Sequence, residues 1–371
     1  MRARDLGIRI GRLAPGPLNA ITDVPGVRVG HTTLISGDGP LRVGVGPVRT
    51  GVTVVVPHDG DMFSEALYAG CHRLNGNGEL TGLEWIRESG LLTTPIALTN
   101  THSVGVVRDA LVAAAVRAGR AGPNHWALPV VGETWDGRLN DIDGQHVRPE
   151  HLWAALEGAV GGAVAEGNVG GGTGMVCHGF KGGIGTSSRV VDGAAGGYTV
   201  GVLVQANYGR RERLTVAGVP VGEEIGTDLV PAPVLPDPAP GAGSIIVILA
   251  TDAPLLPHQC ERLAQRAGMG LARAGGSGDH TSGDLFLAFA TGNRGLTSSD
   301  FDLAQSLTRD VTTLADWHLS ALFWAAIEAT EEAIVNALVA AQTMTGRDGV
   351  TAHAIPHDLL RAAMVRYARR D

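Results

Sequence analysis

The feature that most constrains the fold is a proline-rich segment that ends against a run of branched apolar residues. Five prolines fall within residues 230–240, and each of them removes a backbone amide donor and fixes φ. The segment can be neither a helix nor a central strand, so we predict a loop. The apolar run at 244–251 has the length and composition of a buried strand. Ser244, preceded by Gly243, therefore stands where a loop meets a strand.

Ser244 would become a catalytic nucleophile if the peptide bond before it were cleaved. Its hydroxyl could attack the carbonyl of Gly243 and form an ester, which water then resolves. The new α-amine, with a reference pKa of about 7.7 to 8.0, could act as general base for the hydroxyl of the same residue. We predict self-cleavage into residues 1–243 and 244–371. The alternative is that Ser244 only turns or caps the chain at a strand start.

Composition and charge limit the class of protein. Of 371 residues, 44% are hydrophobic and 18% are charged, which indicates a folded chain with a substantial core. The formal net charge of −8 gives no basic footprint for nucleic acid or an anionic membrane. Three widely separated cysteines imply no disulfide framework, and the charged N-terminus lacks the apolar core of a signal peptide. We expect a cytoplasmic protein with no nucleic-acid or membrane partner.

Strand and helix patterns are mixed along the chain without strict alternation, which favours a layered α/β (α+β) architecture over a doubly wound sheet. Apolar runs predict strands at 51–57, 127–131, 198–207, 244–251 and 284–291. Apolar residues that recur at three and four positions predict helices at 104–117, 150–165, 257–273, 319–342 and 357–369.

The proline-rich segment allows two domain organisations. Its composition suits an interdomain linker as well as a processing loop inside one fold. Residues that are candidates for one site stand on both sides of it. This favours a single domain over residues 1–371, with the processing loop at 230–243.

Several motifs together carry a resemblance to a known family. They are residues 19–31, 99–105, 180–189 and 204–209, followed by Gly243-Ser244 and the triplet at 282–284. In this order they resemble the L-aminopeptidase/D-amidase-esterase family, which includes the β-peptidyl aminopeptidases, over nearly the whole chain. The resemblance implies a four-layer αββα sandwich and a self-processing serine hydrolase of the N-terminal nucleophile type. It also implies a homo-oligomer, a tetramer of cleaved pairs.

Three further catalytic residues follow from this resemblance. Asn207 would point an N–H at the oxyanion that develops during acyl transfer, although an asparagine before Tyr208-Gly209 also suits a plain turn. Ser282 would hydrogen-bond the nucleophile or its amine, and Asp284 would orient these groups. The alternative is that Ser282, Gly283 and Asp284 only form a turn before a strand, because all three residue types are common in turns.

Substrate recognition is assigned to Glu133 and Trp135. Glu133 follows the apolar run at 127–131, and the resemblance implies that its carboxylate binds the substrate ammonium. The alternative is a solvated charge near a turn. At position 135, relatives that prefer short L-peptides and D-amides tend to have tyrosine, but tryptophan lacks the phenolic hydroxyl. This favours β-amino acid substrates.

No motif in the sequence calls for a cofactor or a metal. The glycine-rich stretch at 170–183 is not a phosphate loop, because Phe180 precedes Lys181 and Gly182 follows it, so tight packing beside the site is favoured. Lys181 itself has no assigned role. The thirteen histidines lack zinc-site spacing, and the chain has no Gly-x-Ser-x-Gly elbow.

The sequence therefore predicts an enzyme that removes N-terminal residues from small peptides or amides through an acyl-enzyme on Ser244. The residue removed would be a β-amino acid or a small L-amino acid, with D-amino acid amides or esters as a further possibility. One alternative is an acyltransferase related to the ornithine acetyltransferases, which use threonine as nucleophile. Another is an unprocessed, non-catalytic relative that acts as a binding protein.

Overall fold

The computed structural model describes residues 1–121, 125–234, 243–296 and 308–368. Two β-sheets dominate it. The larger sheet has the order β4-β3-β12-β11-β10-β9, and the smaller has the order β1-β2-β5-β6. The strands of the larger sheet are β3 (Leu67–Gly76), β4 (Leu91–Leu92), β9 (Gly183–Val190), β10 (Thr199–Asn207), β11 (Gly243–Thr251) and β12 (Ser282–Ala290). Those of the smaller sheet are β1 (Arg28–Ser36), β2 (Val48–Val56), β5 (Ile96–Asn100) and β6 (Val130–Thr134).

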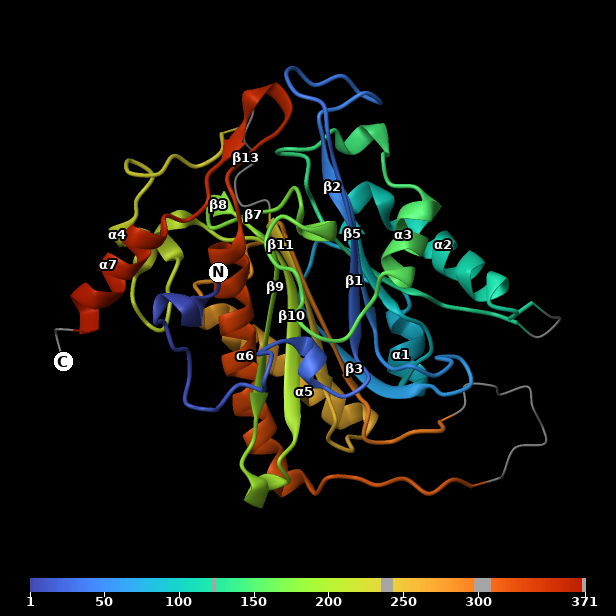
Figure 1. The fold of residues 1–371 in the computed structure, drawn as a ribbon. Helices are drawn as coiled ribbons and strands as arrows, with labels where there is room; N and C mark the ends of the chain where they lie inside the picture. Colours follow the sequence, from blue (N-terminus) through green and yellow to red (C-terminus); the bar gives the residue numbers. More distant parts are fainter. Residues whose placement is uncertain (122–124, 235–242, 297–307, 369–371) are drawn as a thin grey trace.

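Helices cover the outer face of each sheet, so the molecule has four layers in the order αββα (Figure 1). α5 and α6 pack on the larger sheet, and α2 and α3 pack on the smaller one. The helices are α1 (Leu83–Ser89), α2 (Val104–Arg117), α3 (Pro149–Glu157), α4 (Val221–Glu224), α5 (Pro257–Arg273), α6 (Leu319–Ala340) and α7 (His357–Ala368). Two short hairpins, β7 (Val176–Cys177) with β8 (Phe180–Lys181) and β13 (Met344–Thr345) with β14 (Thr351–Ala352), complete the strands.

The run that follows the proline-rich segment forms the centre of the larger sheet because both of its faces are apolar. Val247 and Leu249 of β11 pack toward α5 and α6, whereas Ile246 and Ile248 pack between the two sheets. Successive side chains of a strand point to opposite faces, so a strand covered on both sides needs an unbroken apolar run. The predicted strand is confirmed, and it begins at Gly243.

The larger sheet combines strands from both sides of the proline-rich segment, with β11 and β12 placed between β3 and β10. β11 pairs with β10 in antiparallel orientation and with β12 in parallel orientation. β12 also pairs with β3, which lies far earlier in the chain. The two predicted fragments would therefore share one sheet and one core. Residues 235–242 of the predicted processing loop lie outside the described residues.

Most of the predicted elements are present, with two corrections. The helix predicted at 150–165 ends at Glu157, because Gly158 forms its C-cap and Gly162 has a φ of 107°. The strand predicted at 127–131 is shifted to Val130–Thr134, which follows Pro129. The sequence patterns missed the longer strands β1, β3, β5 and β9, the helices α1 and α4, and the two-residue strands. The last predicted residue of the C-terminal helix lies outside the described residues.

Glycines let helices and strands approach closely, and substitution of Gly185 tests how much stability this close approach contributes. A Cβ at Gly185 in β9 would overlap the carbonyl oxygen of Ala333 in α6. We expect Gly185→Ala to lower the free energy of unfolding by about 3 kcal/mol, since backbone must move to admit the methyl group. Gly105→Ala in α2 is the matched control, because nothing lies within 4 Å of its Cβ. It should be neutral or stabilising by up to about 1 kcal/mol. Thermal unfolding of both variants compares them, and equal effects would contradict this account.

Candidate active site

Ser244 lies at the start of β11, between Asn207 of β10 and Gly283 of β12. Its side chain is 6% exposed. The hydroxyl donates to the carbonyl oxygen of Gly243 at 2.7 Å, and the Gly283 N–H donates to the hydroxyl oxygen at 3.3 Å. The nucleophile predicted from sequence is therefore adjacent to the carbonyl of the bond that we expect to break.

Gly243 is required by the close passage of β10. A Cβ at this position would lie 2.9 Å from the Cα of Tyr208 and 3.0 Å from the carbonyl oxygen of Asn207. Both separations are too short for a real methyl group to fit without movement of the backbone. The absence of a side chain thus keeps the predicted scissile bond against the end of β10.

Asn207 is the last residue of β10 and the direct antiparallel partner of Ser244, so the two side chains share one face of the sheet. Its Oδ1 accepts a hydrogen bond from the Val176 N–H at 2.8 Å, and its Nδ2 donates to the carbonyl oxygen of Trp135 at 2.8 Å. Because one partner can only donate and the other only accept, these bonds fix the orientation of the carboxamide. Among the described residues Nδ2 has this one acceptor, so its second hydrogen is left for another.

Ser282 and Asp284 lie at the start of β12, inside the strand and not in a turn before it. They pair in register with Gly243 and Ile245, so they project from the opposite face of the sheet to Ser244. The Ser282 hydroxyl donates to Asp284 Oδ1 at 2.7 Å and not to Ser244. Burial raises the pKa of Asp284 to about 6. With Gly243, both residues line a pocket of about 920 Å³.

Glu133 is buried on β6, with 3% of its surface exposed. Oε1 accepts the N–H of Glu79 at 2.9 Å, Oε2 accepts the hydroxyl of Thr101, and burial raises the pKa of the carboxyl group. A Cβ at Gly78 would be 3.0 Å from Glu133 Oε1 and 3.1 Å from the Cα of Gly283. Gly78 therefore separates the Glu133 carboxylate from Gly283, whose N–H binds the Ser244 hydroxyl. Across the described ranges, no ion pair neutralises Glu133.

Trp135 directly follows β6, and its backbone and its side chain have different contacts. Its carbonyl oxygen accepts the hydrogen bond from Asn207 Nδ2. Its indole ring packs over Gly137, where a Cβ would collide with the ring. The residue that we expect to influence substrate choice is thus linked through its backbone to the predicted oxyanion donor.

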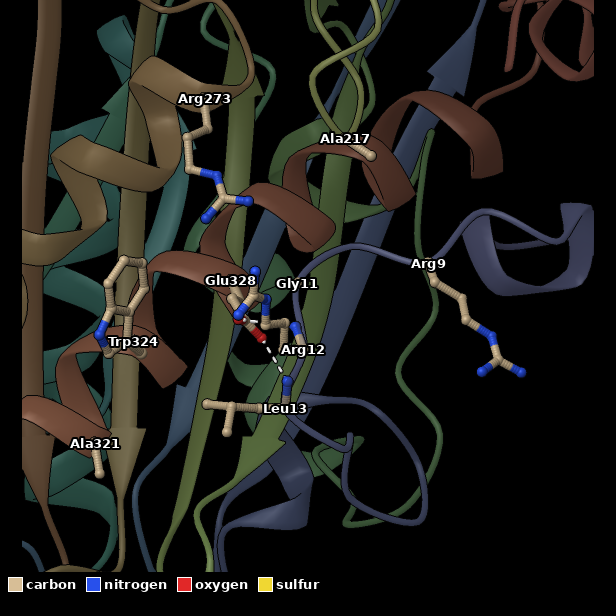
Figure 2. A pocket seen from close by; sticks show the side chains of 9 residues that line it. All are labelled: Arg9, Gly11, Arg12, Leu13, Ala217, Arg273, Ala321, Trp324 and Glu328. Carbon is tan, nitrogen blue, oxygen red and sulfur yellow. Dashed lines mark hydrogen bonds between the residues drawn. The ribbon is translucent and has the colours of Figure 1, made fainter. Parts of the chain in front are cut away.

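A second pocket, of about 770 Å³, lies away from these residues on the outer side of α6 (Figure 2). Glu328 in its wall accepts the backbone N–H groups of Arg12 and Leu13 at 2.9 Å each and so holds the N-terminal segment against α6. None of the predicted site residues lines this pocket. The part of the chain that the structure describes contains no cluster of three metal-ligating side chains, and no helix in it is long and apolar enough to cross a membrane.

Some groups in the site were not predicted from the sequence. The backbone N–H of Val176 and the carbonyl of Trp135 orient Asn207, but any residue supplies such groups, so no side-chain signal marks them. Thr101 does lie within the motif at 99–105, which offered a signal for its hydroxyl.

Known proteins of similar sequence and structure identify the class. Two proteins of similar sequence are named beta-peptidyl aminopeptidase BapA. One, from Sphingosinicella microcystinivorans, is 51% identical over 99% of this chain and 93% of its own length. The other, from Sphingosinicella xenopeptidilytica, is 46% identical over 100% of this chain and 92% of its own.

Solved structures agree with these relatives. A beta-aminopeptidase from a Burkholderia species superposes with a TM-score of 0.91 at 57% identity, covering 99% of both chains. The L-aminopeptidase D-Ala-esterase/amidase of Ochrobactrum anthropi, a variant of the Ntn hydrolase fold, superposes with a TM-score of 0.87 at 44% identity, again over 99% of both chains. The protein is thus a serine aminopeptidase with the N-terminal nucleophile hydrolase fold. Residues 19–352 match peptidase family S58, and the chain belongs to that family.

The raised pKa of Asp284 gives a test of its burial beside Ser282. Its pKa of about 6 exceeds the ordinary 3.8, so the folded state retains a proton that the unfolded state releases between these values. The stability from this group is complete below about pH 4 and is lost as the pH rises through about 6. In a Ser244→Ala background, Asp284→Asn should remove up to about 3 kcal/mol of this pH dependence. Unfolding by urea at about pH 4 and about pH 7 measures it, and identical pH dependence in both proteins would contradict the assignment.

Proposed function

We propose that the chain cleaves itself between Gly243 and Ser244, and that Ser244 is the nucleophile of an aminopeptidase and amidase for small peptides. The observation that carries this proposal is the position of the Ser244 hydroxyl, 2.7 Å from the carbonyl oxygen of Gly243 and on the strand position opposite Asn207. The fragments would remain one intertwined domain, because β11 and β12 lie between β3 and β10.

In the proposed reaction, Ser244 Oγ attacks the carbonyl carbon of the substrate's first residue, and the α-amine of Ser244 accepts the hydroxyl proton. The remaining Nδ2 hydrogen of Asn207 stabilises the oxyanion. Collapse expels the leaving amine, which takes the proton from the α-amine, and water then hydrolyses the acyl-enzyme by the same steps. Self-cleavage would use the same donor, because it also develops an oxyanion.

Ser282 and Asp284 are proposed to hold the new α-amine. Ser282 is the in-register neighbour of Gly243, so its hydroxyl lies beside the position where cleavage would create that amine. Asp284 would orient the Ser282 hydroxyl through the hydrogen bond that its carboxylate accepts from Ser282. This arrangement would favour an orientation in which the amine lone pair faces the Ser244 hydroxyl.

For substrate recognition, we assign Glu133 to the ammonium of the first residue. Among the residues that the structure describes, the buried carboxylate has no cationic partner in an ion pair, and an incoming ammonium would offset the cost of burying it. The named β-peptide activity of relatives at 46% to 51% identity, together with Trp135, supports β-amino acid substrates. We further propose a cytoplasmic location, which rests on the composition, and a homo-oligomer of cleaved pairs, which rests on the family resemblance.

Self-cleavage is tested on the purified protein. Mass spectrometry should find two copurifying fragments, residues 1–243 and 244–371, with a new N-terminus at Ser244. Ser244→Ala should leave one full-length chain, because the attacking hydroxyl is gone. The proposal fails if that variant is still cut at this bond, or if the wild-type chain stays intact while it hydrolyses peptides.

Substrate choice is tested with chromogenic amides. N-acetylation of the substrate should abolish turnover, and Glu133→Gln should lower kcat/KM by about 10- to 100-fold, because the ammonium loses a charged partner. The amide of β-homoalanine should be hydrolysed at a rate comparable with that of L-alanine.

Trp135→Tyr is the matched variant for substrate choice. It should shift the ratio of kcat/KM values toward L-alanine. If the wild type strongly prefers L-alanine and Trp135→Tyr leaves this preference unchanged, position 135 does not set the choice and the β-peptide assignment is dropped.

A further inference from the structure

Lys181 is the one lysine in a sequence that otherwise uses arginine for its basic side chains. Lysine and arginine number 29 together, and 28 of these residues are arginine. Lys181 lies on β8, and its side chain is 0% exposed. Burying a long cationic side chain without a carboxylate partner is costly, so this position requires an explanation.

The ammonium group of Lys181 is held by backbone carbonyls. Nζ donates to Met175 O and Gly182 O at 2.8 Å each and to Gly172 O at 3.2 Å. Three acceptors match the three N–H bonds of the charged form, whereas a neutral amine would turn its lone pair toward a carbonyl oxygen. Burial lowers the pKa of Lys181 to about 7, whereas hydrogen bonds to the charged form favour that form. No ion pair involving Lys181 occurs within the described residues.

A chain of amide groups connects Lys181 to the predicted oxyanion donor. Nζ binds the carbonyl of Met175, and the N–H of the same peptide group, that of Val176, donates to Asn207 Oδ1 at 2.8 Å. The Asn207 carboxamide then donates through Nδ2 to Trp135 O at 2.8 Å. Each amide in such a chain is polarised by the one before it. A positive charge at the carbonyl end makes both Nδ2 hydrogens stronger donors.

The surrounding backbone explains why the cation is lysine. A Cβ at Gly182 would overlap Ala206 O, and one at Gly172 would overlap the Ile184 N. The walls of the site are therefore closely packed main chain. A compact ammonium on a flexible stem fits among three carbonyls, whereas a planar guanidinium presents its donors in a broad, rigid fork. This packing also accounts for the glycine-rich stretch that contains Lys181.

We propose that Lys181 is a positioning residue for acyl transfer. It acts through the Met175–Val176 peptide group and the carboxamide of Asn207 on the oxyanion that forms when Ser244 attacks the acyl carbonyl. The inference rests on the proposed function, because it requires Asn207 to be the oxyanion donor. Lys181 has two effects in this arrangement: it fixes the peptide group that orients the carboxamide, and its charge strengthens the hydrogen bonds that the carboxamide donates.

A double-mutant cycle with Lys181→Met and Asn207→Ala tests this coupling. Rates are measured per mole of chain that carries Ser244 at its N-terminus, and circular dichroism and thermal unfolding check the fold. Alone, Lys181→Met should lower kcat about tenfold with KM nearly unchanged, and Asn207→Ala should lower kcat about 100-fold or more. In the Asn207→Ala background, Lys181→Met should have no further effect. Additive losses would overturn the proposal, because a general structural defect acts without Asn207.

A second variant separates charge from packing. Lys181→Gln can still donate to two carbonyls but is neutral, so it should retain the fold and show a kcat between those of the wild type and Lys181→Met. Wild-type kcat in both folded variants would overturn the role of Lys181. By contrast, unchanged kcat in Asn207→Ala would refute the Asn207 assignment itself. The two failures are therefore distinguishable.

The wild-type protein provides a measurement that needs no variant. Selective ¹³C,¹⁵N-lysine labelling should give a single side-chain signal, because Lys181 is the only lysine. Its Nζ and Cε chemical shifts should be those of a charged ammonium at the pH of the assay. A neutral amine at that pH would overturn the proposal even if every variant failed to fold.

Discussion

The site depends on the register of β11 between its two neighbours. Antiparallel pairing with β10 puts Ser244 opposite Asn207, and parallel pairing with β12 puts it beside Gly283. A shift of one residue would turn Ser244 to the other face of the sheet and bury Gly243 in its place. Both faces of β11 are apolar, so burial alone does not set this register, but each face is closely packed against a different core. Close packing therefore fixes the position of the proposed nucleophile.

Close backbone packing is the second constraint on the site. Gly243 admits the end of β10, Gly78 lies between Glu133 and β12, and Gly172 and Gly182 surround the Lys181 ammonium. In these places the main chain supplies hydrogen-bonding groups at short range, and glycine lets them approach. Backbone amides cannot rotate as side chains do, so a site that they line is already organised before the substrate binds.

Buried charge in the site is balanced in different ways. Glu133 keeps a carboxylate among hydrogen-bond donors, and Asp284 has a raised pKa beside a serine. Within the described part of the chain, the Lys181 ammonium donates to three backbone carbonyl oxygens. Each arrangement leaves a charge that a ligand, a new amine or an oxyanion could use. Arg189 and Glu332, 2.6 Å apart, show the contrasting arrangement, in which two buried charges pair with each other.

Sequence patterns alone were enough to predict the central strand, the exact bounds of the helices at 104–117 and 257–273, and a small nucleophile preceded by glycine. They were enough because local apolar periodicity and proline chemistry act over a few neighbouring residues. They did not determine that Ser282 and Asp284 project from the opposite face to Ser244, nor that Val176 and Trp135 orient Asn207 through their backbone. These contacts arise from the packing of the folded chain. They join residues from strands far apart in the chain, and every amino acid other than proline has the same backbone groups to offer.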